Sequence, residues 1–225
     1  MYHNYAKYFD KIFPAKKGTI DFLDTYLRGE TVLDIGCGSG GYAIALHQKG
    51  YTLKGIDLDE EMIRYAKAKD ASIAFTTQNM LTMDDTKFHS IYCIGNTLVH
   101  LPSKQDIQAF LNTCFKKAEH CLLLQIINYD RVLDQHIIAL PTIENEEVRF
   151  ERKYAFKKDK VVFSSTLRAP QKQYHNSVEL IPLRKQELED MLQEAGFQNI
   201  QSFSGFQEEA FHENSYALVI VANKE

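Results

Sequence analysis

The chain has only four cysteines in 225 residues, and none of them is spaced as a pair. This excludes the Cys-x-x-Cys pattern of zinc and redox sites. Three of the four, Cys93, Cys114 and Cys121, lie in apolar runs, so we expect them to be buried free thiols. The eight histidines form no His-x-x-x-His pair, and the sequence therefore supports no metal site. Together these features indicate a reducing, cytoplasmic environment.

Long apolar runs and a strong charge bias are also missing. No run of roughly 18 apolar residues is present, so no transmembrane helix is expected, and residues 1–8 lack the apolar core of a signal peptide. The net charge of -4 gives no general attraction to nucleic acid or to an anionic membrane. Neither is expected as a partner, while the oligomeric state stays open, with a homodimer among the alternatives.

What is present is an ordinary globular composition, 44% hydrophobic and 25% charged. Strand-like and helix-like runs alternate, which predicts an α/β fold with a doubly wound, Rossmann-like sheet of seven mostly parallel strands, the last one antiparallel. The expected strands are residues 31–35, 51–57, 72–76, 88–94, 121–127, 197–203 and 215–222. Asp59 and Ser103 are expected to cap the helices that follow them, and Gly196 to end the helix of residues 184–195.

The pattern changes after about residue 130. Apolar side chains lie on one face of an alternating run that is otherwise largely charged: Val148, Phe150, Tyr154 and Phe156. Such alternation is typical of antiparallel strands with one wet face, and it returns near residues 161–167 and 178–182. We therefore predict a small antiparallel sheet at residues 141–182, inserted into a main domain formed by residues 1–140 and 183–225.

The most informative stretch is Val32-Leu33-Asp34-Ile35-Gly36-Cys37-Gly38-Ser39-Gly40. A strand, a glycine turn and a helix in this order expose backbone N–H groups to a nucleotide-like ligand, and glycine allows close approach. The spacing Gly36-x-Gly38-x-x-Gly41 also matches the dinucleotide fingerprint. An NAD-dependent oxidoreductase is therefore one of the alternatives.

An acidic residue, Asp57, ends the second expected strand, at about the 20-residue spacing that the dinucleotide fingerprint requires. Its carboxylate can accept hydrogen bonds from both hydroxyls of a ribose. Asp57 could instead only cap the next helix. Because Asp59 is better placed for that cap, we favour the ribose role for Asp57.

The glycine-rich stretch resembles the first motif of the class I S-adenosylmethionine-dependent methyltransferases, which reads hydrophobic-Leu-Asp-hydrophobic-Gly-Cys-Gly-x-Gly. The resemblance implies that the backbone of Gly36, Cys37 and Gly38 contacts the cofactor. It also implies that Asp34 organises the turn and approaches the methionine amino group of S-adenosylmethionine. Hydrogen bonding from the amides of the turn to Asp34 is a simpler role, and both roles can hold at once.

The same resemblance implies further cofactor contacts for four residues: Leu58, Met62, Asn79 and Met80. Asn79 would bind the adenine amine, and the others would supply apolar surface to the adenosine. An ordinary loop or plain core packing is the alternative for each of them. Tyr8 lies in Tyr5-Ala6-Lys7-Tyr8-Phe9-Asp10, which resembles an amino-terminal segment that folds over the cofactor. Docking of this segment on the edge of the core is the other interpretation.

Residues 94–101 resemble the Gly-Asn-Ser-x-x-His-Leu stretch of the glycine N-methyltransferase-like branch. The match implies a cofactor contact for Gly95 and catalytic roles for Asn96 and His100. His100 could accept a proton from the acceptor, although a packing role is the alternative. A weaker echo is Asn128-Tyr129-Asp130, where Ile127 stands in place of the arginine that often precedes it.

The missing arginine puts a small amino-acid acceptor in doubt, because a carboxylate anchor is absent from that position. Three other arginines could replace it, or could be solvated surface charges: Arg131, Arg168 and Arg184. The sequence predicts an S-adenosylmethionine-dependent methyltransferase that acts on a nitrogen or oxygen of a small molecule, with the inserted sheet as a lid over the acceptor. The alternatives are an NAD-dependent oxidoreductase and a non-catalytic S-adenosylmethionine-binding protein.

Overall fold

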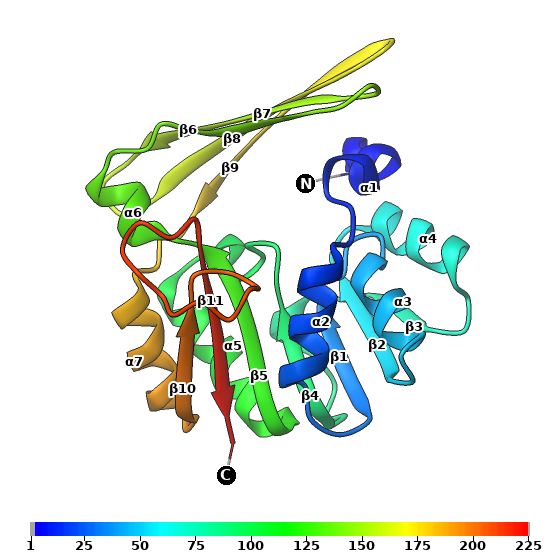
Figure 1. Ribbon diagram of the computed structural model, residues 1–225, viewed down its shortest axis with the longest axis vertical. Helices are drawn as coiled ribbons and strands as arrows, with labels where there is room; N and C mark the ends of the chain where they lie inside the picture. The colour runs from blue at the N-terminus through cyan, green and yellow to red at the C-terminus, as the bar shows by residue number, and fades with distance from the viewer. Residues whose placement is uncertain (1–2, 225) are drawn as a thin grey trace.

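The computed structural model describes residues 3–224 and contains two β-sheets (Figure 1). The larger has seven strands in the order β10-β11-β5-β4-β1-β2-β3. Its strands are β1 (Thr31–Ile35), β2 (Thr52–Asp57), β3 (Ala74–Thr77), β4 (Phe88–Cys93), β5 (Ala118–Ile127), β10 (Gln198–Phe203) and β11 (Ala217–Asn223). Only β11 runs against the others, since it pairs antiparallel with both β5 and β10. The predicted fold class is confirmed.

Continuous apolar runs form the central strands because both of their faces are covered. In β11 the side chains of Leu218 and Ile220 enter the core on one face of the sheet. Those of Val219 and Val221 enter the core on the other face. Successive side chains of a strand point to opposite faces, so a run without polar residues requires a layer on each side.

Helices supply these two layers. Buried apolar side chains of α2 (Lys17–Tyr26), α3 (Gly41–His47) and α4 (Glu60–Lys69), among them Phe22, Leu46 and Ile63, belong to the core on one face. Those of α5 (Lys104–Lys117) and α7 (Lys185–Ala195) belong to the core on the other. Shorter elements are α1 (Phe9–Ile12), α6 (Tyr129–Asp134) and the 3₁₀ helices His3–Tyr8, Met80–Thr82 and Leu98–His100. The result is a three-layer α/β/α domain.

The predicted helix boundaries are confirmed by the contacts of their capping residues. Asp59 Oδ1 accepts hydrogen bonds from the amides of Glu61 (3.0 Å) and Met62 (3.4 Å) at the start of α4. Ser103 Oγ accepts a hydrogen bond from the Asp106 amide (3.1 Å) at the start of α5. α7 ends at Gly196, whose φ of 109° is left-handed and suits glycine.

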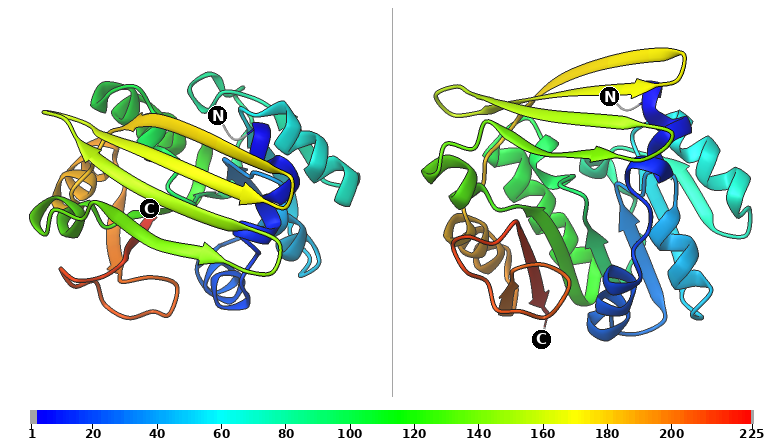
Figure 2. Two further views of the ribbon diagram at one scale, coloured as in Figure 1. Left: turned by 90° about the horizontal axis from the view of Figure 1, so that it is seen from above. Right: turned by 45° about the horizontal axis from the view of Figure 1, so that its top comes forward.

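The second sheet lies across the carboxyl ends of the parallel strands (Figures 1 and 2). It consists of β6 (Ala139–Glu144), β7 (Arg149–Phe156), β8 (Val161–Ala169) and β9 (Lys172–Leu180), paired antiparallel in chain order. We call it the covering sheet. The sequence predicted three alternating pieces here, whereas the structure has four strands. Pro141 and a register shift between Leu140 and Ile143 interrupt the alternation of β6, so its pattern is not visible.

The amino-terminal segment lies between the two sheets (Figure 1). Tyr5 and Ile12 form a small apolar core with Phe150 and Leu167 of the covering sheet and with Val148, which directly precedes β7. The Tyr5 hydroxyl lies 3.2 Å from the Ser165 hydroxyl of β8. The segment is therefore held by the covering sheet on one side, and its other contacts are described with the site below.

Two further expectations concern the chain as a whole. Within residues 3–224, no helix combines the length and the apolar character that crossing a membrane requires. The four cysteines are free and buried, which confirms the prediction for Cys93, Cys114 and Cys121. Cys37, which the sequence assigned to the cofactor, has a buried side chain as well.

Candidate functional site

The glycine-rich turn after β1 packs directly against the end of β4. Gly36, Gly38 and Gly40 all have positive φ angles, between 53° and 80°. A Cβ atom on Gly36 would lie 2.5 Å from the side chain of Thr97. Glycine is therefore required at this position for conformation and for space, because any side chain would push the turn away from β4.

The amides of this turn are bound within the protein. The N–H groups of Gly36 and Cys37 donate to the Ile56 carbonyl oxygen at 2.8 and 3.0 Å, and that of Gly38 donates to Asp57 Oδ2 at 2.9 Å. The N–H groups of Gly36, Cys37 and Gly38 therefore point to acceptors on β2, so contact of these three residues with a ligand would involve other backbone atoms. The Cys37 side chain is buried with Sγ facing the Gly38 carbonyl, so only its backbone can reach a cofactor.

Asp57 ties the turn to the end of β2. Its Oδ2 accepts from the Gly38 amide, and its Oδ1 accepts from the Asp59 amide at 2.9 Å. Burial raises the pKa of Asp57, and these two amides oppose the rise. Since Asp59 caps α4, the interpretation of Asp57 as the cap is wrong. Asp57 is a carboxylate at the carboxyl end of the sheet, next to the glycine turn.

A second acid, Asp34, lies on β1 next to this turn and is almost fully buried. Burial raises its pKa to about 7; the Tyr92 hydroxyl opposes the shift and the Asp57 carboxylate adds to it. The Gly38 amide binds Asp57 and not Asp34, so the simpler role proposed for Asp34 fails for that amide. Asp34 is thus an acid that ionises near neutral pH, close to a second carboxylate.

The residues expected around adenosine differ in their exposure. Leu58, next to Asp57, is 72% exposed, whereas Met62 on α4 is 2% exposed and packs in the interior. The loop that carries Asn79 and Met80 is joined to β2 by a hydrogen bond from the Gln78 amide to the Asp57 carbonyl oxygen (2.9 Å). Asn79 Oδ1 accepts from the Leu81 amide and, as a carbonyl oxygen, keeps a second lone pair for a donor on a ligand.

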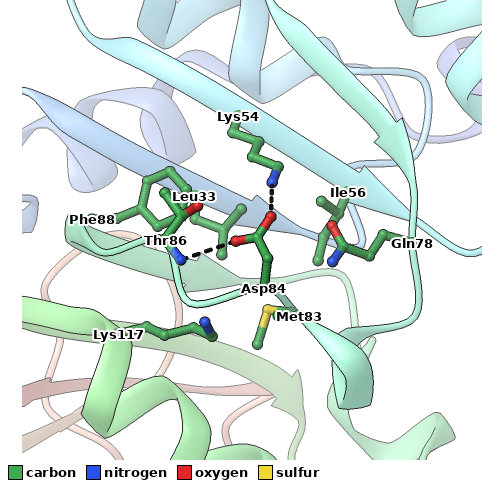
Figure 3. Close-up of a pocket in the computed structure, with 9 residues that line it drawn as sticks. All are labelled: Leu33, Lys54, Ile56, Gln78, Met83, Asp84, Thr86, Phe88 and Lys117. Carbon is green, nitrogen blue, oxygen red and sulfur yellow. Dashed lines mark hydrogen bonds and ion pairs between the residues drawn. The ribbon is translucent and has the colours of Figure 1, made fainter.

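A small hollow lies behind this loop (Figure 3). Asp84 bridges the loop to β2, because it pairs with Lys54 Nζ at 3.0 Å and accepts from the Thr86 amide at 3.0 Å. The contacts from Thr86 and Lys54 hold the pKa of Asp84 well below its usual range. The buried side chain of Lys117 enters from the end of α5. This arrangement anchors the loop of Asn79 and Met80 and lies outside the predicted site.

Asn96 joins β4 to β5. Its φ of 67° is left-handed, a conformation in which asparagine is among the more tolerated residues. Asn96 Oδ1 accepts from the Ile127 amide at 2.9 Å, and Nδ2 donates to the Tyr129 hydroxyl at 3.2 Å. The amide of neighbouring Gly95 donates to the Gln125 side chain at 2.7 Å. Both ends of the Asn96 side chain are therefore engaged in holding strand ends together.

His100 lies in the 3₁₀ helix after β4, near the base of the covering sheet. The Ile181 amide, just after β9, donates to the Val99 carbonyl oxygen at 2.9 Å. Burial lowers the pKa of His100 to about 4, so its imidazole is neutral at pH 7. A neutral imidazole is the form that can accept a proton, but the lowered pKa also makes His100 a weaker base than an exposed histidine.

The amino-terminal segment reaches the glycine turn through residues that sequence analysis did not single out. A Cβ on Gly38 would lie 2.9 Å from the ring of Phe9. Asp10 accepts a hydrogen bond from the Ser39 hydroxyl at 2.5 Å and pairs with Lys69. Tyr8, the residue assigned to the cofactor, instead packs its ring on Tyr174 of the covering sheet (6.3 Å between centroids). The segment thus contacts both the turn and the covering sheet.

Two of the three arginines suggested as carboxylate anchors are paired within the protein. Arg184 binds Asp134 at 2.6 Å and Asp130 at 3.1 Å. Arg168 lies 3.8 Å from Glu151. Neither guanidinium is therefore free of a carboxylate partner.

One cluster of potential metal ligands lies at the amino ends of β4 and β5, where the ligand atoms of His89, Glu119 and His120 are within 4.8 Å of one another. Two backbone amides, of Glu30 and Thr31, donate to His89 Nδ1 at 3.0 Å. The proton of the neutral ring then resides on Nε2, which faces Glu119 at 3.5 Å. Because Nε2 carries a proton, it has no lone pair for a metal, and we assign no metal site here.

Comparison with known proteins agrees with this geometry. A sequence model described as a methyltransferase domain matches residues 32–118, which include the glycine turn, Asp57 and His100. The chain is 27% identical over 206 residues to the glycine/sarcosine N-methyltransferase of Aphanothece halophytica, and the match covers 86% of this chain and 76% of that protein.

Solved structures show the likeness of the fold over the whole chain. A S-adenosylmethionine-dependent methyltransferase from Clostridium acetobutylicum superposes with a TM-score of 0.83 at 18% identity, covering 99% of this chain and 98% of that chain. An amino pentose methyltransferase from Micromonospora echinaspora, solved with S-adenosylmethionine bound, gives a TM-score of 0.72 at 14% identity, covering 100% and 92%. The covering sheet is included in both matches.

The contacts of Asn96 predict a structural role that can be measured without any ligand. Asn96→Ala removes two hydrogen bonds and places alanine in a left-handed conformation, so we expect the free energy of unfolding to fall by about 2–4 kcal/mol. Asn96→Gly should cost less, because glycine adopts the same backbone without strain. Urea unfolding followed by circular dichroism measures both. Asn112→Ala, on the exposed face of α5, is the control, and equal stability of the two alanine variants would contradict the assignment.

Proposed function

We propose that this chain, a class I S-adenosylmethionine-dependent methyltransferase, transfers a methyl group to a nitrogen or oxygen of a small-molecule acceptor. The observation that carries the proposal is the enclosure of the carboxyl edge of the parallel strands, where the covering sheet lies above and the amino-terminal segment closes one side (Figure 2). Two of the proteins compared above carry names that specify small acceptors, which supports this class. The matches favour neither the NAD-dependent oxidoreductase nor a non-catalytic binding protein.

The residues at the carboxyl edge fit the adenosine half of the cofactor. We assign the ribose hydroxyls to Asp57, whose oxygens each hold one amide and keep lone pairs for further donors. The exposed side chain of Leu58 offers apolar surface beside it, and we assign the adenine ring to Leu58 and Met80, with buried Met62 as support. Asn79 Oδ1 would accept a hydrogen bond from the adenine amine.

The methionine half is assigned to the other side of the turn. The backbone of Gly36, Cys37, Gly38 and Gly95 would contact the cofactor, and Asp34 would face its amino group. Tyr8 would act less directly, because its ring packs on Tyr174 and so helps to hold the amino-terminal segment over the turn.

For methyl transfer the protein mainly has to align the acceptor with the methyl group of the cofactor. Bound S-adenosylmethionine supplies a methyl group already activated by its sulfonium. The chain would position the acceptor in line with that methyl group and exclude water beneath the covering sheet. His100, neutral at pH 7, is the group assigned to accept the acceptor's proton. Asn96 would serve this step by holding the ends of β4 and β5 in place.

The function is tested by incubating the purified protein with S-adenosylmethionine and a panel of small amines and alcohols that includes glycine, sarcosine and amino sugars. We expect release of S-adenosylhomocysteine only when an acceptor is present, with a methylated product detected by mass spectrometry. Binding of S-adenosylhomocysteine without methylation of any acceptor would favour a non-catalytic binding protein instead. Binding of NAD without binding of S-adenosylhomocysteine would overturn the assignment of the cofactor site.

Asp57, which ends β2, and Asp59, which caps α4, should separate cofactor binding from helix capping. Asp57→Ala should raise the dissociation constant of S-adenosylhomocysteine at least about tenfold, since it removes a charge-assisted acceptor for the ribose. Asp59→Ala should instead lower the free energy of unfolding by about 1 kcal/mol and leave the affinity within about twofold. Calorimetric titration and urea unfolding of both variants check this. An unchanged affinity in Asp57→Ala would refute the ribose assignment.

Asp34 predicts a pH dependence of cofactor binding. Its pKa is raised to about 7 in the free protein, and the cofactor's ammonium group binds the ionised form. Below pH 7 binding must displace a proton, so the dissociation constant of S-adenosylhomocysteine should rise by up to about tenfold per pH unit as the pH falls, and should level off above pH 7. Calorimetric titration between about pH 5.5 and pH 8 measures this. Asp34→Asn should bind more weakly with a flat profile; a wild-type profile that is flat would exclude this role for Asp34.

A further inference from the structure

The inner face of the covering sheet carries a charged residue among apolar ones. Phe150 and Tyr154 of β7 are buried on the face toward the main domain, and Arg152 lies between them at the same alternate spacing. The register places Arg152 opposite Leu140 of β6 and Ser165 of β8, and Ser165 opposite Asn176 of β9. A polar row, Arg152–Ser165–Asn176, therefore crosses the middle of an otherwise apolar face.

Arg152 is half-buried, and its neighbours are neutral. Nη2 donates to the Pro141 carbonyl oxygen at 2.6 Å, and Nη1 lies 3.5 Å from the Tyr216 hydroxyl. The Nε atom is buried and makes no hydrogen bond within the described part of the chain. Across residues 3–224, no carboxylate lies within 4.0 Å of this guanidinium. By contrast, Arg149 and Arg168 of the same sheet both face Glu151.

The polar row continues into the main domain at the carboxyl edge. Tyr216 directly precedes β11 and is 41% exposed. Burial raises the pKa of Tyr154, and the nearby Tyr129 and Tyr216 add to the rise while Arg152 opposes it. Tyr129 in turn accepts a hydrogen bond from Asn96. A guanidinium and three phenols thus gather next to the strand ends where we place methyl transfer.

The energetics of Arg152 indicate the chemistry of its partner. A partly buried charge without a counter-ion is costly, and the cost is offset when an anion binds. The planar guanidinium presents five N–H donors in a geometry that matches an oxyanion, and the phenol of Tyr216 can donate to the same group. The buried amide nitrogen of Asn176, which makes no hydrogen bond in the described structure, adds a neutral donor to the row.

We propose that Arg152, with Tyr216 beside it, binds an oxyanion carried by the methyl acceptor and so determines acceptor specificity. This inference rests on the proposed function, because it places the acceptor beneath the covering sheet. The oxyanion is a carboxylate or a phosphate ester; a guanidinium and a phenol recognise both.

The test uses protein loaded with S-adenosylhomocysteine and follows the Nε–Hε NMR signal of Arg152, assigned by comparison with Arg152→Gln. Sodium acetate and inorganic phosphate are the anionic probes, and acetamide is the neutral probe of the same shape as acetate. We expect a saturable shift of this signal with at least one anion, and none with acetamide. Saturation by acetate alone indicates a carboxylate acceptor, and saturation by phosphate alone indicates a phosphate ester.

Calorimetric titrations of three variants complete the test. Arg152→Gln should weaken binding of the active anion at least about tenfold, and Tyr216→Phe should weaken it severalfold. Arg168→Gln, on the opposite face of the covering sheet, is the matched control and should change it less than about twofold. Binding of S-adenosylhomocysteine should be unchanged in all three variants. The proposal would be overturned if neither acetate nor phosphate gave a saturable shift. It would also be overturned if Arg152→Gln and Arg168→Gln weakened anion binding equally.

Assays of methylation distinguish a failure of the oxyanion site from a failure of the proposed function. If glycine is methylated and glycinamide is not, Arg152→Gln should raise KM for glycine at least about tenfold. Methylation of neutral acceptors only, with KM unaffected by Arg152→Gln, would refute the oxyanion site and leave the methyltransferase intact. Anion binding at Arg152 without turnover of any acceptor would support the site while refuting the proposed reaction.

Discussion

The carboxylate of Asp57 is the contact on which the rest of the candidate site depends. One of its oxygens holds the glycine turn after β1, and the other holds the chain just before α4. These bonds form because β1 and β2 are parallel neighbours whose carboxyl ends coincide, with Ile35 opposite Ile56. A buried carboxylate is stable only when donors surround it, so the turn and the helix start are fixed together. The surface offered to a ligand exists before the ligand arrives.

Most of the region around the glycine turn and the end of β2 was predictable from the sequence, because its sequence patterns are local. The glycine turn, the acid that ends β2 and the capping residues Asp59 and Ser103 each act within a few positions of the chain. Apolar runs buried on both faces identify β5 and β11 equally well. Local reasoning could not show where the amides of Gly36, Cys37 and Gly38 donate, because their acceptors, Ile56 and Asp57, come from the next strand.

The region around Asn96 and the covering sheet, where we place the acceptor, was less predictable because its contacts join segments that are distant in the sequence. The partners of Asn96 come from the end of β5 and the start of α6, about thirty positions away. β6 has an interrupted alternation, and α6 is too short to show a helical period. The sequence nonetheless contained a pattern that singles out Arg152. This residue falls in phase with Phe150 and Tyr154 on the apolar face of β7, where burying a charged side chain is costly unless it has a partner.

The division between the two halves follows from what each must recognise. In the proposed assignment the cofactor would be recognised mainly by groups fixed to strand ends, such as Asp57, so short motifs can encode its site. In the proposal the acceptor would be recognised by the covering sheet, whose Tyr154 lies near Tyr129 and Tyr216 at the strand ends. Because that sheet packs on the main domain and on Tyr5 of the amino-terminal segment, side chains on its inner face can change without disturbing the glycine turn. Specificity for the acceptor can therefore vary while the site for the methyl donor stays the same.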